Sequence, residues 1–220
     1  MGFDLAESLK YLVVLLPSLT VHEFAHAWAA WRLGDDTAAR MGRLTLNPIP
    51  HIDPIGTLAL PLLGVPIGWA KPVPVNPANF RRGIRMSTGD LLVSIAGPIS
   101  NLLLALLGAI AYALFVRFSG GPPDRPMVEL VSVFILMNVG LAVFNLLPLP
   151  PLDGSHVVGS LVPNRWRDAW DAFQRVGPII LLVLLVSGAF TGRSLLWVVI
   201  GPPRNFILGL LDRVIGTLAV

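Results

Sequence analysis

The segment His22-Glu23-Phe24-Ala25-His26 combines residues whose types and spacing suit the binding of a zinc ion. On a helix, two histidines four residues apart share one face and lie one turn from each other. One Zn²⁺ ion can accept a ring nitrogen from each, and Glu23 can then act as the base for a metal-activated water. The alternative is a structural role, in which the histidines lie on an exposed helix face or are hydrogen-bonded in a core.

The sequence around this motif favours the metal site. Glu23 is the only formal charge between Lys10 and Arg32, a stretch long enough to cross a hydrocarbon core of roughly 30 Å. A charged side chain near the middle of a span costs from roughly 2.5 kcal/mol upward, so ionisable residues there indicate a functional site. We therefore predict a metal site inside the membrane, nearer to the end of the span at Arg32.

Two histidines do not complete a catalytic zinc site, which uses three protein ligands and leaves a fourth position for water. Of the remaining acids, Asp153 is the best placed, because it ends an apolar run within the segment 145–154, where three prolines break the helix. Gly154 permits a tight turn or the close approach of another helix. The alternative role for Asp153 is to cap a helix that runs through Leu161.

The chain as a whole has the composition of a membrane protein. Of its 220 residues, 54% are hydrophobic and 13% are charged, about half the charged share of a soluble domain. A soluble enzyme of this length could not bury so much apolar surface, and a disordered chain would be far more charged. The sequence contains no cysteine, which excludes disulfides and thiolate chemistry.

Apolar runs predict four transmembrane helices. They lie between Lys10 and Arg32, from Leu91 to Val116, between Glu129 and Asp153, and from Val176 to Gly192. A last stretch, 194–211, is interrupted by two prolines and an arginine, so it is either a broken span or a helix at the interface. The N-terminus lacks a basic cluster and a cleavage site, so we expect the first span to remain in the mature protein.

The stretch from Pro54 to Ala70 is apolar but is not predicted to form a spanning helix. It contains prolines and glycines at short intervals, and proline inside a helix removes a hydrogen bond and clashes with the preceding turn. Irregular backbone at membrane depth must be covered by protein or by a water-filled cavity. We therefore expect a re-entrant loop or hairpin packed on the helices, followed by an extended segment at 68–75.

The distribution of Lys and Arg predicts the orientation of the chain in the cell membrane. The segments 34–87 and 163–175 together hold nine of these residues, whereas the opposite side holds four. The first set should face the cytoplasm, which places the N-terminus outside and the metal site towards the cytoplasmic side. The formal charge of +3 comes from scattered residues, so it does not indicate binding to nucleic acid.

Taken together, these motifs resemble those of the site-2 protease family of intramembrane zinc metalloproteases (peptidase family M50), in its compact prokaryotic form. Besides the HExxH motif, residues 145–154 match the family pattern NxxPxPxLDG without a mismatch. The stretches 47–56 and 68–77 are similar to compact prokaryotic members, and residues 96–101 resemble a family GPxxN element. The resemblance covers most of the chain, about residues 12–161.

The resemblance implies an all-α polytopic membrane fold, with about five to six transmembrane or re-entrant segments and a small membrane-associated β-hairpin. Residues 1–220 would form a single membrane-embedded metalloprotease domain, with a catalytic core at about 5–162 and C-terminal helices at 176–216. The protein would lie in the inner or plasma membrane. Its partners would be the lipid bilayer and a transmembrane protein substrate, and its oligomeric state is not predicted.

For the site, the resemblance implies that His22, His26 and Asp153 bind one zinc ion per chain. Glu23 would be the general base for a zinc-activated water and would then protonate the leaving amine. Asn145 would help to position the substrate carbonyl or its oxyanion. The reaction would be hydrolysis of peptide bonds within or near transmembrane segments, as in regulated intramembrane proteolysis, with the substrate paired to an edge of the hairpin.

Several assignments stay open. A metal or proton transporter, or an inactive scaffold of the same fold, could carry the same ionisable residues. His51 is either a site-lining residue or a loop histidine at the interface, and His156 is expected to support the site rather than to be a fourth ligand. Asn101 is expected to hydrogen-bond a neighbouring helix rather than to contact substrate.

Overall fold

The computed structural model describes residues 5–63, 68–191 and 194–219, the side chains of 188–191 excepted. Five helices in these ranges are long and apolar enough to cross a membrane. They are α1 (Leu5–Leu33), α4 (Met86–Ser119), α5 (Arg125–Asn145), α7 (Arg167–Thr191) and α8 (Leu195–Leu218). The chain is therefore an all-helical multi-pass membrane protein, as predicted.

The first four of these helices correspond to the four predicted spans, although α5 covers only the first part of the third and residue 192, the end of the fourth, lies outside the described residues. Helix α8 gives the form of the stretch 194–211. Although Pro202 and Pro203 lie inside it, α8 continues without a break to Leu218. It packs against α4 and α5, and this packing supports the helix where the prolines remove hydrogen bonds. The stretch is thus one helix of spanning length rather than a broken one.

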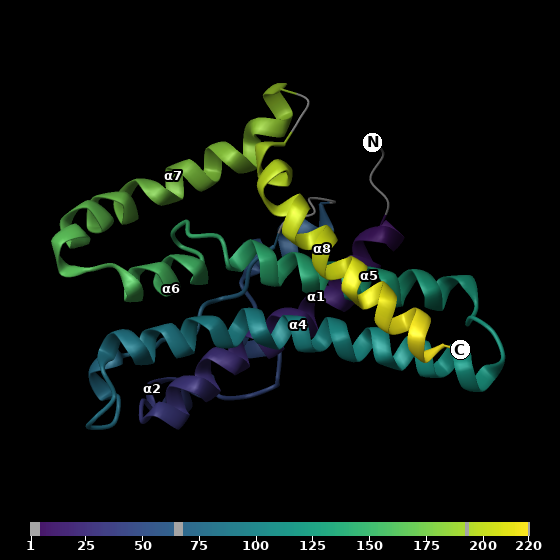
Figure 1. Ribbon diagram of the computed structural model, residues 1–220, viewed down its shortest axis with the longest axis horizontal. Helices are drawn as coiled ribbons and strands as arrows, with labels where there is room; N and C mark the ends of the chain where they lie inside the picture. The colour runs from purple at the N-terminus through teal and green to yellow at the C-terminus, as the bar shows by residue number, and fades with distance from the viewer. Residues whose placement is uncertain (1–4, 64–67, 192–193, 220) are drawn as a thin grey trace.

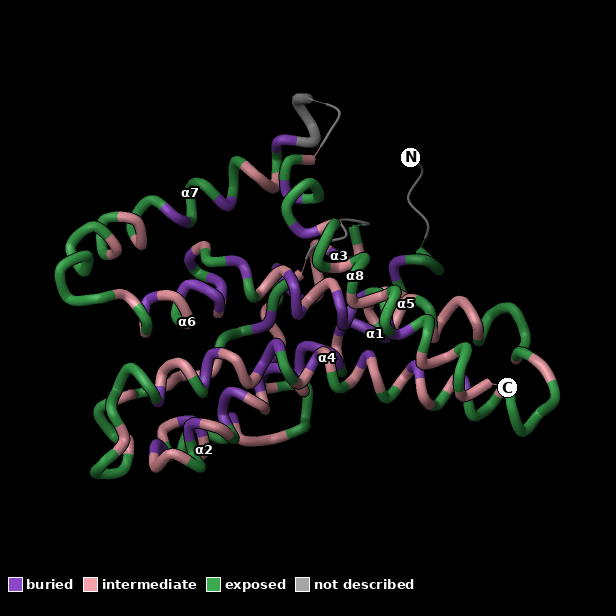
Figure 2. Tube along the Cα trace, viewed as in Figure 1, coloured by how far each residue is buried: buried purple, intermediate pink, exposed green. Residues whose placement is uncertain are grey.

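Helix α4 lies at the centre of the bundle and packs against α1, α5, α6 (Asp153–Leu161) and α8 (Figure 1). Three alanines spaced four residues apart along it, Ala105, Ala109 and Ala113, are completely buried. Small side chains let neighbouring helices approach closely, which is how helices associate where lipid is as apolar as the protein. Burial is accordingly concentrated where α1, α4, α5 and α6 meet, whereas α7 is largely exposed (Figure 2).

The segment between α1 and α4 folds into short helical turns. They are α2 (Thr37–Arg40), η1 (Ile49–His51), the π-helical turn η2 (Pro54–Ala59), α3 (Leu60–Leu62) and η3 (Pro77–Asn79). Residues 64–67, at the tip of the predicted re-entrant loop, lie outside the described residues. Residues 68–76 are extended, as expected, and run back past α1.

The predicted β-hairpin is wrong for the part of this segment that the structure describes, which contains no strand. Two backbone hydrogen bonds do join its two sides, from Trp69 N to the Gly56 carbonyl and from Lys71 N to the His51 carbonyl. Prolines at 72 and 74 have no N–H to donate, so the ladder cannot continue. An extended segment held by side chains takes the place of the hairpin.

The third predicted span also ends earlier than its apolar run. Helix α5 stops at Asn145, and α6 begins at Asp153. The connection between them contains three prolines, with a cis bond between Pro150 and Pro151. A short 3₁₀ turn, η4 (Asn164–Trp166), then leads into α7.

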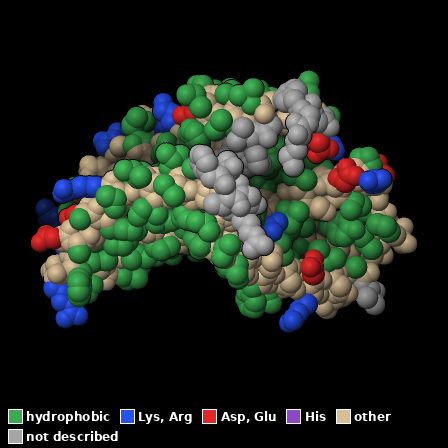
Figure 3. Space-filling view, turned by 90° about the horizontal axis from the view of Figure 1, so that it is seen from above, with side chains coloured by type: hydrophobic (Ala, Val, Ile, Leu, Met, Phe, Trp, Pro, Cys, Tyr) green, Lys and Arg blue, Asp and Glu red, His purple; other side chains and the backbone are tan. Residues whose placement is uncertain are grey.

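The outer surface of the bundle is apolar. Hydrophobic side chains form broad patches on the face shown in Figure 3. Large exposed side chains occur along each long helix, for example Val13 on α1, Leu107 on α4, Ile179 on α7 and Phe206 on α8. Patches of this extent on a soluble protein would cause association, but on a membrane protein they contact lipid.

Candidate metal centre

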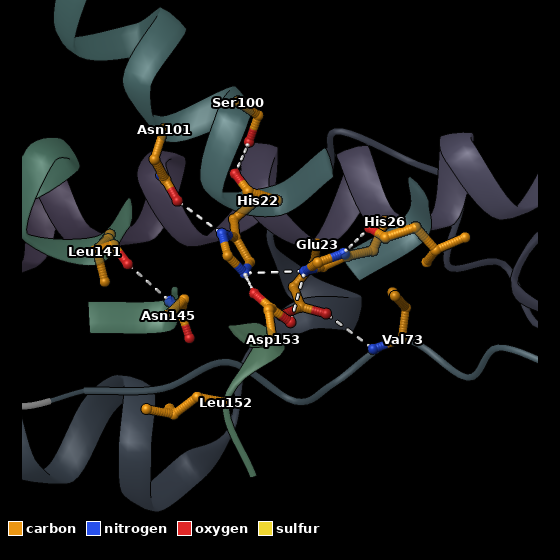
Figure 4. Close-up of polar contacts among 12 residues, drawn as sticks. His22, Glu23, His26, Val73, Ser100, Asn101, Leu141, Asn145, Leu152 and Asp153 are labelled. Atoms are coloured by element: carbon orange, nitrogen blue, oxygen red, sulfur yellow. Dashed lines mark hydrogen bonds and ion pairs between the residues drawn. The ribbon is translucent and has the colours of Figure 1, made fainter. Parts of the chain in front are cut away.

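The three predicted ligands come together where α1, α4 and α6 meet (Figure 4). His22 and His26 lie one turn apart on α1, and their Nε2 atoms are 3.0 Å apart. Asp153, in the first turn of α6, places Oδ2 3.2 Å from Nε2 of His22 and Oδ1 3.3 Å from Nε2 of His26. Side chains from two distant parts of the sequence thus converge on one point.

Both imidazole rings are oriented by acceptors on α4. The Nδ1 atom of His22 lies 2.7 Å from Oδ1 of Asn101, and Nδ1 of His26 lies 2.8 Å from the carbonyl oxygen of Val93. Because both partners accept, each ring must donate from Nδ1, and a neutral ring then carries a lone pair on Nε2. Each histidine therefore presents a metal-binding nitrogen towards Asp153.

This arrangement suits a cation. Two nitrogen lone pairs and a carboxylate face one another, and Oδ2 of Asp153 is buried without a hydrogen-bond partner among the described residues. Zinc bonds of about 2.0–2.1 Å in a tetrahedron separate neighbouring donor atoms by about 3.3 Å, close to the three distances given above. The donor set of two imidazoles and one carboxylate is also one that zinc accepts. The residues therefore fit a zinc ion.

Two glycines allow the helices to approach this closely. A Cβ atom on Gly97 of α4 would overlap Nε2 of His26 and Cε1 of His22, so α4 can pass the rings only with glycine there. A Cβ atom on Gly154 would overlap the carbonyl groups of Leu146 and Leu147. Of the two alternatives predicted for Gly154, the structure shows the tight turn, because the neighbouring backbone belongs to the connection between α5 and α6.

A buried network of hydrogen-bonded polar side chains orients His22 through Asn101. Nδ2 of Asn101 donates to the carbonyl of Ser18 at 3.2 Å and to Oδ1 of Asn138 on α5 at 2.9 Å. Nδ2 of Asn138 in turn donates to Oγ of Ser18 at 2.9 Å. Both asparagines are completely buried, so an unpaired amide here would be costly. The network fixes the Asn101 oxygen towards His22.

Glu23 is buried beside the histidines and is held by the extended segment. Its Oε2 accepts a hydrogen bond from the backbone N–H of Val73 at 2.8 Å. We refer to residues 69–76 as the strap. They run past α1 at Glu23 and contribute to the wall of a cavity of about 500 Å³. His22, Glu23, His26 and Asp153 line the same cavity.

Asn145 also lies in the wall of this cavity. It is the last residue of α5, and its Nδ2 donates to the Leu141 carbonyl at 3.0 Å (Figure 4). Apolar side chains on α5, among them Leu141 and Phe144, form the adjoining surface. The cavity therefore combines an apolar wall with a few polar groups, as substrate pockets generally do.

Comparisons with known proteins agree with this geometry. The family model described as "Peptidase family M50" matches residues 121–187. "Putative zinc metalloprotease YwhC" of Bacillus subtilis is 41% identical, over 94% of this chain and 93% of that protein. The chain belongs to peptidase family M50. "Putative zinc metalloprotease Rip2" of Mycolicibacterium smegmatis is 34% identical, over 79% of this chain and 65% of that protein. No solved structure matches.

Membership of this family makes the chain a zinc metalloprotease, a hydrolase with zinc as its cofactor. The M50 relatives therefore favour the protease over the transporter that the sequence left open. The family-model match covers α5, α6 and the greater part of α7, including Asn145 and Asp153, while the HExxH motif on α1 lies outside it.

The other two histidines of this M50 peptidase lie at different distances from the candidate metal site. His51 is buried in the turn η1, where its Nε2 lies 3.0 Å from the Thr45 carbonyl, and it is not among the residues that line the cavity. His156 does line the cavity, one turn beyond Asp153, with Nδ1 3.4 Å from Oδ2 of Asp90. The hydrogen bond to Asp90 raises the pKa of His156 above its usual range.

Asn101 hydrogen-bonds residues of neighbouring helices, as predicted. Four further neighbours of the site were not predicted: Asn138, Gly97, the Val93 carbonyl and the Val73 amide. For Asn138 a signal was present, since a carboxamide inside an apolar helix needs a polar partner. The Val93 carbonyl and the Val73 amide leave no such signal in the sequence, because every residue has a backbone carbonyl and every residue except proline has a backbone N–H.

Proposed function

We propose that this M50 peptidase is an intramembrane endopeptidase that cleaves peptide bonds within or near transmembrane segments of membrane proteins. The observation that carries the proposal is the burial of His22, Glu23 and His26 on a helix of spanning length, facing Asp153 and a cavity. Glu23 lies ten residues before the end of α1 at Leu33, roughly 15 Å along the helix axis. The catalytic groups would therefore lie at membrane depth.

His22, His26 and Asp153 would hold one zinc ion per chain. When bound, zinc supplies Lewis acidity to a water molecule and to the scissile carbonyl. Asn101 and the Val93 carbonyl keep the two imidazole rings in the orientation that this binding needs. All three ligand side chains line the cavity, through which water and the substrate peptide would enter.

Glu23 would act as the general base. Because its Oε2 is engaged by the Val73 amide, Oε1 would take the proton from the attacking water. As the new carbon–oxygen bond forms and the carbon–nitrogen bond breaks, Glu23 would pass that proton to the leaving amine nitrogen. The products would be a carboxylic acid and an amine within the membrane.

Asn145 would help to position the substrate, since it lies in the cavity wall at the end of α5. Its Nδ2 uses one hydrogen for the Leu141 carbonyl, and the other could donate to the scissile carbonyl or its oxyanion. A substrate helix has its peptide groups shielded by internal hydrogen bonds, so it must unwind before it can occupy this cavity. The extended strap offers a neighbouring backbone for the unwound segment.

We further propose that the whole chain forms one membrane-embedded domain in the cell membrane. The excess of Lys and Arg in 34–87 and 163–175 supports an orientation with the N-terminus outside and the site towards the cytoplasm. In this orientation, the cavity would receive water and protons from the cytoplasmic side.

The substitution Glu23→Gln tests the proposal. The wild type and the variant would each be reconstituted in lipid vesicles with a labelled substrate peptide. This peptide would have a single span of about 20 apolar residues with a central Asn-Gly pair. We expect the variant to fold and keep its zinc but to lose at least about 100-fold in cleavage rate, since proton transfer by a placed base is worth this much or more. Asp171→Asn, a matched change on the exposed face of α7, should cleave at the wild-type rate.

The site of cleavage decides the intramembrane part of the proposal. Mass spectrometry of the products should place the broken bond inside the apolar stretch of the peptide or at its boundary. Cleavage of water-soluble peptides alone, or a Glu23→Gln variant as active as the wild type, would overturn the assignment.

A further inference from the structure

The hydrogen bond between the Val73 amide and Glu23 joins the catalytic helix to a segment 50 residues away in the sequence. Glu23 is only 8% exposed, and a buried carboxylate needs hydrogen-bond donors or a neighbouring cation. The Val73 N–H donates to Oε2 at 2.8 Å, a length typical of a charge-assisted hydrogen bond. This contact is therefore well placed to stabilise and to orient the carboxylate.

The sequence of the strap leaves a single donor at this point. Pro72 and Pro74 flank Val73, and neither has an N–H group. A proline also disfavours helical backbone at the residue before it, here Lys71 and Val73. The three residues thus present one backbone amide to Glu23 on a stiff segment.

The strap is fixed before and after Val73. Before it, the Trp69 carbonyl accepts a hydrogen bond from Oγ1 of Thr57 at 2.7 Å, and Lys71 N donates to the His51 carbonyl at 2.9 Å. Arg43 donates from Nη2 to the Lys71 carbonyl. Desolvation lowers the pKa of Arg43, and the negative charge of Glu23 acts in the opposite direction.

Beyond Val73, the strap is attached to the end of α1 through Asp35, which is completely buried. One oxygen of Asp35 accepts from Asn76 N at 2.7 Å, and the other accepts from Nδ2 of Asn79 at 2.9 Å. Burial alone would raise the pKa of Asp35, but hydrogen bonds from Thr37, Asn76 and Asn79 hold it below its usual range. The anchors on both sides fix the position of the Val73 amide relative to α1.

We infer that Val73 is a positioning residue, whose backbone N–H holds Oε2 of Glu23 so that Oε1 faces the cavity. The inference rests on the proposed role of Glu23 as the base. The same cavity wall contains the side chain of Val73, so the amide and the side chain must be tested separately. The substitution Val73→Pro removes the N–H, whereas Val73→Ala removes most of the side chain and keeps the N–H.

The test compares these two variants in lipid vesicles on the labelled single-span peptide described above. Because a hydrogen bond to a charged group is lost, we expect kcat of Val73→Pro to fall about 10- to 100-fold below that of Val73→Ala, with similar KM. Zinc content and thermal midpoint should be the same in both variants. Equal kcat values, or a difference confined to KM, would overturn the inference and indicate a role in substrate binding or none.

A second variant covers the case in which Val73→Pro does not fold. The α-hydroxy acid analogue of valine at position 73 replaces only the N–H with oxygen, and it should show the same fall in kcat. Wild-type kcat for this ester would overturn the inference.

A readout independent of activity is hydrogen exchange at this amide. Between residues 72 and 74 only Val73 carries an exchangeable backbone hydrogen, so its protection can be assigned to one position. Protection should fall in Glu23→Ala and persist in Glu23→Gln, which keeps an acceptor oxygen. Unchanged protection in Glu23→Ala would overturn the inference.

Activity of Glu23→Gln separates the two proposals. A variant that cleaves like the wild type overturns the proposed function itself. If Glu23→Gln is inactive while Val73→Pro matches Val73→Ala, the inference about Val73 fails and the function stands.

Discussion

Helices α1 and α7 are both long and apolar, yet they occupy opposite places in the molecule. Within an apolar stretch of 18 residues, 56% is buried inside the protein in α1, against 11% in the segment Asn164–Ser187, which includes most of α7. Helix α1 carries the buried His22, Glu23 and His26, whereas α7 exposes Ile179 and Leu182. Lipid is as apolar as a protein interior, so hydrophobicity alone cannot distinguish the two positions. The buried polar residues make the difference.

Each of the three ionisable side chains of the HExxH motif on α1 has a hydrogen-bond partner on α4 or on the strap. His22 meets Asn101, His26 meets the Val93 carbonyl, and Glu23 meets the Val73 amide. Helix α7 packs mainly against α8 and η4. The comparison therefore predicts that α1 is sensitive to small changes and that α7 is tolerant of them.

The largest effect is expected from removing a ligand on α1. His26→Ala deletes one of the three groups that converge on the metal position, so zinc content should fall from one ion per chain to near zero and cleavage should be abolished. Inductively coupled plasma mass spectrometry measures the zinc, and vesicle cleavage measures the activity. Chelation should inactivate the wild type in the same way, and added zinc should restore the wild type alone. A His26→Ala protein that keeps full zinc would contradict the ligand assignment.

The second-largest effect is expected from a single methyl group added to α4 beside the histidines. Gly97→Ala would place Cβ against both histidine rings and displace them. We therefore expect zinc affinity to fall by about 100-fold, the upper end of the range seen when groups that orient metal ligands are changed. Gly140→Ala on α5 is the matched control, because a Cβ there meets nothing within 4 Å. Zinc-buffered titration of the two variants measures the difference. Equal affinities would show that α4 can move away from the rings.

A smaller effect is expected from changes in the polar network that orients His22. Asn101→Leu removes the acceptor of the Nδ1 hydrogen bond, so the ring loses its orientation and zinc affinity should fall about 10-fold. Asn138→Leu should cost less, since it leaves the Asn101–His22 bond in place. The same titration ranks the two variants. If Asn138→Leu lowers zinc affinity more than Asn101→Leu does, the hydrogen-bonded asparagines act mainly on folding rather than on the orientation of the His22 ring.

The sequence was informative where a local pattern carried the signal. Long apolar runs located the spans, and the spacing of His22 and His26 placed them on one face of a helix. The approach of Asp153 to them could be expected only through its charge in a proline-broken apolar run and through family resemblance. The convergence of the three ligands also depends on the close approach of α4 to α1 at Gly97 and on the tight packing of Gly154 against residues 146–147, and both effects appear only when the elements are packed.

Other features could not be read from the pattern. The prediction of a β-hairpin was wrong for the described residues. Side chains of Thr57 and Asp35 hydrogen-bond the strap, and the prolines at 72 and 74 prevent a continuous series of backbone hydrogen bonds. The peripheral place of α7 was hidden because a lipid-facing helix and a buried one have the same composition. The strap contact to Glu23 is made by a backbone amide, which the side-chain sequence does not encode directly.

The smallest effect is expected on α7. Ile179 is 64% exposed, and in a bilayer acyl chains can occupy the space that Ile179→Ala leaves, so neither cavity nor water results. Cleavage rate and thermal midpoint in vesicles should therefore stay at wild-type values. Leu15→Ala on α1 is the matched reference, because this side chain is completely buried and its loss leaves a cavity worth about 2 kcal/mol or more. If Ile179→Ala is as destabilising as Leu15→Ala, α7 must be covered by protein in the membrane, and its exposed face would then be an interface rather than a lipid surface.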